Sequence, residues 1–109
     1  MANNQYDTDE VTPIDYATLT VSNAAGGVGL ADATPAITAG RTVKRAVITL
    51  ETDQVRWRCD GTAPTASEGH LMEVGSALSF MSNGYQQTLN KIKFIRVTGD
   101  AALKITYYD

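Results

Sequence analysis

Apolar and polar residues alternate along most of the chain with the two-residue period that is typical of β-strands. Segment 41–52 is the clearest example, because Ala46, Ile48 and Leu50 fall on one side of an extended chain. Its other side is also partly apolar in the middle, which favours a central position in a sheet. Segment 102–109 alternates in the same way. Further strands are predicted at 18–21, at 54–59, at 91–99, and as two short pieces within 70–81 around a turn at 74–76.

Glycine-containing and polar segments separate these strands, and none shows the apolar spacing of an α-helix for more than one turn. Asp60-Gly61 is a typical turn sequence, and Gly69 suits a positive φ in the loop before the next strand. Short strands at regular intervals predict an all-β fold. We expect an antiparallel β-sandwich, of jelly-roll or Ig-like type, with seven or eight strands. It would span residues 17–109, after an extended N-terminal arm at residues 1–16.

Composition then narrows the classes of function. The chain has 109 residues, enough for one domain, and its single Cys and single His exclude an intrachain disulfide and a site with two imidazoles. The net charge of −3 argues against a nucleic-acid binder. No apolar run is long enough to cross a membrane, and no signal peptide is visible. We therefore expect no enzyme activity, no catalytic, cofactor or metal site, and no nucleic-acid or membrane partner.

Cys59 and His70 are the residue types most often found in catalytic sites, but the sequence pattern favours structural roles for both. Cys59 shares one side of its strand with Val55 and Trp57, so we expect a small buried side chain rather than a reactive thiol. His70 stands at the start of a strand without an evident partner for catalysis, and we expect it to be a surface or loop-anchoring residue.

Charge is distributed unevenly along the chain. Residues 1–40 contain five acidic residues and no Lys or Arg, whereas residues 41–109 carry nine basic and seven acidic residues. Such asymmetry can mark a segment that binds a partner. The simpler interpretation is a solvated terminus. The alternative is an arm that docks on a neighbouring subunit, and its candidate contact residues are Asp9, Glu10, Val11, Ile14 and Tyr16.

Arg56 and Arg58 are the most informative polar residues of the predicted domain, because they share one strand side. They form either a solvated sheet face or a contact with an acidic partner surface, for which the bidentate guanidinium is well suited. Tyr85, Tyr107 and Tyr108 could form an aromatic platform for a sugar, although packing explains Tyr107 more simply.

The segment AVITLETDQVRWRCDGTAPTASEGHLM (46–72), together with FIRVTGDAALKITYYD (94–109), resembles small structural proteins of tailed-bacteriophage virions. The resemblance implies a capsid decoration (cement) protein on the outside of the shell, made in the host cytoplasm. Its partners would be the major capsid protein and copies of itself, as a homo-oligomer. A tail or fibre adaptor and a carbohydrate-binding or adhesin module are the alternatives.

Overall fold

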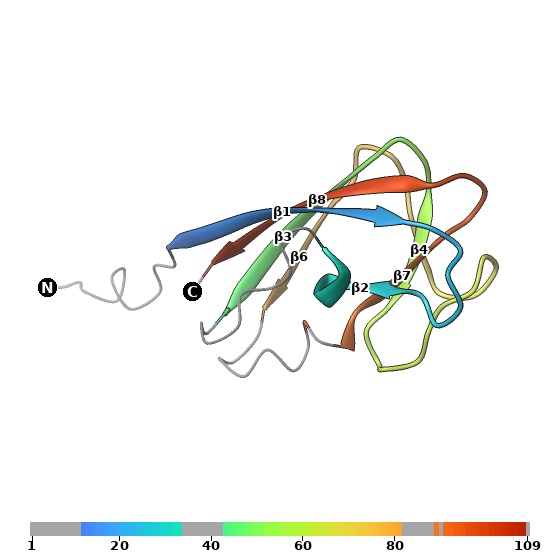
Figure 1. The fold of residues 1–109 in the computed structure, drawn as a ribbon, viewed down its shortest axis with the longest axis horizontal. Coiled ribbons are helices and arrows are strands. Elements are labelled where there is room, and N and C mark those ends of the chain that lie inside the picture. Colours follow the sequence, from blue (N-terminus) through green and yellow to red (C-terminus); the bar gives the residue numbers. More distant parts are fainter. Residues whose placement is uncertain (1–11, 34–42, 82–88, 90, 109) are drawn as a thin grey trace, which may run out of the picture.

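The structure of the chain is a computed structural model, and it describes residues 12–33, 43–81, 89 and 91–108. Eight strands form two four-stranded antiparallel sheets packed face to face, which confirms the predicted all-β sandwich (Figure 1). Sheet A has the strand order β1(Pro13–Val21), β8(Ala101–Tyr108), β3(Arg45–Glu51), β6(Ala77–Met81). Sheet B has the order β2(Val28–Gly29), β7(Lys93–Arg96), β4(Val55–Arg58), β5(His70–Met72).

The longest strands are those whose alternation is most regular in the sequence. In β3 the predicted inner residues Ala46, Ile48 and Leu50 are all buried, and β3 lies between β8 and β6 as a central strand. In β8 every second residue is buried over the whole strand. Alternating apolar residues place one face of each strand in the core, so burial reinforces the local extended conformation.

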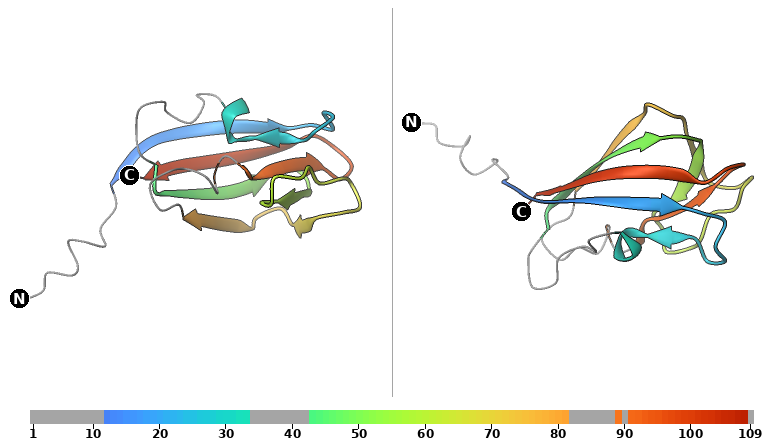
Figure 2. Two further views of the ribbon diagram at one scale, coloured as in Figure 1. Left: turned by 90° about the horizontal axis from the view of Figure 1, so that it is seen from below. Right: turned by 45° about the horizontal axis from the view of Figure 1, so that its top comes forward.

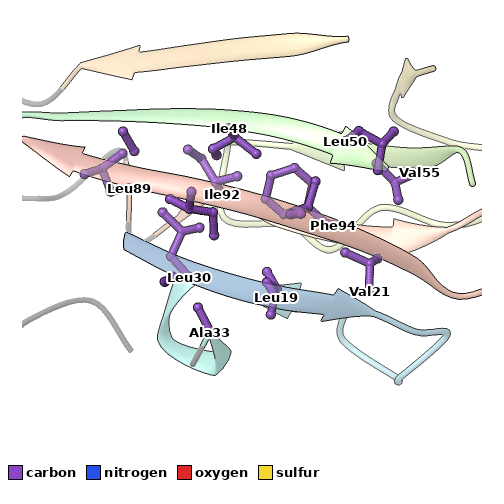
Figure 3. Packing of buried hydrophobic residues seen from close by; sticks show 14 of the residues in the cluster. Leu19, Val21, Leu30, Ala33, Ile48, Leu50, Val55, Leu89, Ile92 and Phe94 are labelled. Carbon is purple, nitrogen blue, oxygen red and sulfur yellow. The ribbon is translucent and has the colours of Figure 1, made fainter. Parts of the chain in front are cut away.

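The core lies between the two sheets (Figure 3). Phe94 of β7 is fully buried and packs in one cluster with Ile48 of β3 and Leu19 of β1. Leu30 enters the same cluster from η1(Leu30–Asp32), a single 3-10 turn that the strand pattern did not predict. The Asp32 carboxylate accepts a hydrogen bond of 2.9 Å from the Gly29 N–H and so caps this turn.

Strand β1 begins before the predicted domain boundary. Pro13 already pairs with Tyr108 of β8, and a register shift follows between Pro13 and Asp15. Residues 13–16, which the sequence assigned to the arm, therefore belong to sheet A. Figure 2 shows β1 along the border of this sheet. Asp9, Glu10 and Val11 lie outside the described residues.

The two predicted short strands within 70–81 are confirmed as β5 and β6, with the turn at Gly75 between them. Gly75 has a φ of 89°, which costs little for glycine. The connection between β3 and β4 differs, because Thr52 has a φ of 85° without being glycine. A β-branched residue in this conformation is strained.

Candidate protein interface

The predicted arm contacts divide between the core and the surface. Ile14 packs against the hydrophobic core of its own domain, so it anchors β1 rather than a neighbouring subunit. Tyr16 lies on the outer face of sheet A with 54% of its surface exposed. Of the proposed arm residues that the structure describes, Tyr16 is therefore the one whose side chain is presented to a partner.

Arg56 is used inside the domain. Its Nε donates to the Ala66 carbonyl at 3.0 Å and its Nη1 donates to the Gly69 carbonyl at 2.9 Å. These bonds hold the loop at residues 62–69 against the outer face of sheet B. The guanidinium therefore fastens a loop of its own chain, which the strand pattern did not indicate.

Arg58 pairs with a carboxylate two residues along the chain. Its Nε donates to Asp60 Oδ1 at 3.1 Å, and its Nη2 bonds Asp60 Oδ2 in a bidentate pair. This hydrogen bonding raises the pKa of Arg58 above its usual value and lowers that of Asp60. The pair is exposed, so it adds little to stability. The predicted basic patch of Arg56 and Arg58 is thus engaged within the chain.

The loop after β4 lies on the outer face of sheet B and covers it at Arg56, while Leu71 of β5 on the same face stays 46% exposed. Pro64 is buried in it, and a side chain at Gly27 would come within 3.6 Å of the Pro64 ring. Gly69 has a φ of 127°, and a Cβ there would lie 3.1 Å from the Trp57 carbonyl oxygen. Glycine is required at this close approach. Residues 62–69 therefore have a structural role, which is to pack on the outside of sheet B.

Sheet A, in contrast, has an outer face that no described element covers (Figure 1). The strand registers align its outward residues in rows that run across all four strands. One row is Tyr16, Thr106, Val47 and Ser79, and the next is Thr18, Lys104, Thr49 and Ala77. We call this surface the threonine face; its outward residues are Tyr16, Thr18, Thr20, Arg45, Val47, Thr49, Glu51, Ala77, Ser79, Met81, Ala102, Lys104, Thr106 and Tyr108.

Few charges interrupt the threonine face. Arg45 lies across one end, where its Nε donates to Ser79 Oγ at 2.9 Å and its guanidinium lies 5.8 Å from the centre of the Tyr108 ring. Met81, beside Arg45 in the register, is 66% exposed. The other charged residues of the face are Glu51 and Lys104. A rigid, nearly neutral surface with exposed aromatic and Met side chains costs little to desolvate and suits a protein partner.

A second surface feature is a small open hollow at the end of sheet B, lined by Arg58, Glu68, Gly69 and His70. The His70 ring lies beside the Trp57 ring, with 4.6 Å between their centres. His70 is exposed, as predicted. Trp57 is half-buried against the core and also meets the Phe80 ring edge-on at 5.2 Å. The indole of β4 therefore connects sheet B with β6, an edge strand of sheet A.

The structure corrects two sequence expectations. Cys59 is exposed rather than buried, because β4 ends at Arg58 and the chain turns before Cys59 can face the core. Tyr107 is fully buried, so it is not part of a sugar-binding platform with Tyr108. Tyr85 lies outside the described residues.

Within the described ranges, no three His, Cys, Asp or Glu side chains gather in a way that would hold a metal ion. No helix in that part of the chain is long and apolar enough to cross a membrane. A search of protein-family models, of curated proteins and of solved structures found no match to this chain. What the structure defines is an antiparallel β-sandwich with a loop fastened on one outer face and another outer face that the described residues leave uncovered.

Proposed function

We propose that this protein is a non-enzymatic structural component of a virion, a decoration protein that binds the outside of a phage shell and stabilises it. Its partners are the major capsid protein and copies of itself. The sequence resemblance to tailed-phage structural proteins in segments 46–72 and 94–109 supports this proposal. The threonine face is the observation that carries it, because it is wide, rigid and nearly neutral.

The contrast between the two outer faces indicates which of them would bind the shell. Sheet B is covered at Arg56 by the loop that this residue fastens, whereas the threonine face is left open by the described residues. A decoration protein needs a preformed flat surface and no reaction chemistry, since rigid surfaces lose little entropy on binding. The threonine face is therefore the surface we assign to the shell.

The proposal is tested with shells assembled without the protein. Adding it should raise the temperature at which the shells disrupt. Thr106→Glu places a carboxylate in the uncharged row of the threonine face, and burying an unpaired charge should lower shell occupancy at least tenfold. Thr65→Glu, on the exposed loop over sheet B, is the matched control and should bind as the parent does.

An unchanged disruption temperature would overturn the decoration role. Equal occupancy of the Thr106→Glu variant and the parent would show that the shell binds elsewhere on the domain. Attachment to tails but not to shells would instead support the tail or fibre adaptor.

A further inference from the structure

Strand β1 forms one border of sheet A, and borders of sheets carry unpaired backbone groups. The direction of these groups follows from the hydrogen bonds of the neighbouring strands. The Leu50 N–H of β3 donates to the Ser76 carbonyl at 3.1 Å, beside β6. The backbone groups of Leu50 therefore point away from β8. Leu50 and its β8 partner Leu103 are therefore a pair without hydrogen bonds between them. The N–H and carbonyl of Leu103 point away from β3 and towards β1.

Leu103 is paired with Leu19 in β1, so the Leu19 N–H and carbonyl point into the sheet. Because the direction alternates from one residue to the next, the backbone groups of Tyr16, Thr18 and Thr20 point out of the sheet edge. The Tyr16 N–H already donates to Asp15 Oδ1 at 2.9 Å. The three outward-directed residues thus offer a partner strand two N–H donors, from Thr18 and Thr20, and three carbonyl acceptors.

Ser22, two residues after Thr20, confirms that the backbone groups of every second residue point out of the sheet edge. Ser22 accepts a hydrogen bond of 3.1 Å from the Arg96 N–H of β7, on the side away from β8. Among the described residues, no backbone hydrogen bond of that kind reaches Tyr16, Thr18 or Thr20. The edge is therefore open at the Tyr16 carbonyl and at the backbone groups of Thr18 and Thr20, and it is closed at Ser22.

We propose that this edge pairs with the same edge of a second copy, antiparallel and with Thr18 opposite Thr18 of that copy. In this register Tyr16 of each copy faces Thr20 of the other. Because each Tyr16 N–H is bonded to Asp15, the three residue pairs exchange about four hydrogen bonds. A shift by two residues in either direction loses one of the three pairs or uses Ser22, which is already bonded. The two four-stranded sheets become one continuous sheet of twice the width.

The side chains of the edge favour a second copy over a charged partner strand. Tyr16, Thr18 and Thr20 are uncharged, so a two-fold axis brings no like charges together. Tyr–Thr and Thr–Thr pairs across strands are stabilising. Charged side chains, Lys above all, usually protect exposed edges. Strand β1 contains no Lys, and its Asp15 carboxylate occupies the Tyr16 N–H but leaves Thr18 and Thr20 free to pair. The resulting dimer also doubles the threonine face, because both copies turn the same side of the sheet outwards.

This inference rests on the self-association part of the proposed function, and its test uses the full chain in solution without shells. Light scattering across a concentration series should give twice the 11.7 kDa chain mass. Thr18→Pro removes one outward N–H but none of the bonds to β8, and should give the monomer mass with unchanged circular dichroism. Thr18→Lys should do the same if proline disturbs the fold. Thr49→Lys, on central strand β3 of the same face, is the matched control and should stay dimeric.

The register is read by cross-linking in a Cys59→Ser background, which removes the exposed thiol. Thr18→Cys should be linked between copies by a short bis-maleimide, whereas Thr49→Cys should not. A monomeric parent, or a Thr18→Lys variant that stays dimeric, would overturn the inference. Neither outcome depends on shell binding. Failure of this dimer inference is therefore distinguishable from failure of the proposed decoration role, which the Thr106→Glu variant tests.

Discussion

At the scale of single residues, the structure assigns roles that strand parity alone does not reveal. Arg56 and Arg58 share one side of β4, yet one fastens a loop and the other pairs with Asp60. Tyr107 follows its predicted inward parity and is fully buried, but its hydroxyl has no hydrogen-bond partner among the described residues. Burial of this hydroxyl disfavours its ionised form, so the stability of the fold depends on pH through Tyr107.

Burial, and then the negative charge of Asp15, raise the pKa of Tyr107 to about 12. The unfolded chain has the ordinary tyrosine pKa of about 10. Between these values the unfolded state loses the proton while the folded state keeps it, so the free energy of unfolding falls as pH rises. We expect a loss of about 2–3 kcal/mol between pH 10 and 12 from this group. Urea unfolding at several pH values would measure it.

The Tyr107→Phe variant is the control for this pH dependence, because other groups also titrate in that range. In this variant the fall in the free energy of unfolding between pH 10 and 12 should be smaller by the contribution of Tyr107. At neutral pH the variant should be at least as stable as the parent. A parent and a variant with the same slope would show that Tyr107 does not ionise differently in the two states.

Thr52 is a second position where one residue determines stability. Its φ of 85° is costly for a β-branched residue and free of strain for glycine. Thr52→Gly should therefore raise the free energy of unfolding by about 0.5–1 kcal/mol, after the larger entropy of unfolded glycine is subtracted. Thr49→Gly, within β3, should instead lower the free energy of unfolding. Thermal denaturation would measure both, and a destabilised Thr52→Gly variant would contradict the strain.

At the scale of elements, the strands with regular alternation were predictable, whereas the two-residue strand β2 and the start of β1 were not. Strands β3 and β8 follow from residue parity, since one side of each is apolar throughout. Residues 28–32 gave no strand signal, yet Val28–Gly29 pairs with β7 and Leu30 is buried by the next turn. These contacts depend on residues more than sixty positions away. The start of β1 was also missed, because the bulge after Pro13 breaks the alternation.

The start of β1 makes a prediction about truncation. Residues Pro13–Tyr16 pair with β8, and Ile14 packs on the core. A chain lacking residues 1–16 should therefore be less stable than one lacking residues 1–11, by about 2 kcal/mol or more. Urea denaturation of the two truncated chains measures the difference. Equal stability would mean that the domain begins at residue 17, as the sequence pattern first indicated.

At the scale of the whole molecule, the two sheets have different surroundings. The loop at residues 62–69 packs on the outside of sheet B, while the described residues leave sheet A open on its outer face and along the β1 edge. These two open surfaces are at right angles to each other, because backbone groups lie in the plane of a sheet and side chains project from it. One molecule can therefore use its edge for a second copy and its threonine face for a shell at the same time.

The sequence by itself determined the fold class and the inward residues of the regular strands β3 and β8, because alternation with period two is a local property that sets which side of a strand is buried. It also placed the turns at Gly61 and Gly75. Only the tertiary structure decided which surfaces are open. The loop over sheet B, the engagement of both arginines, and the alignment of threonines from four strands all depend on which strands become neighbours. That order is fixed by packing between distant segments, which no local pattern contains.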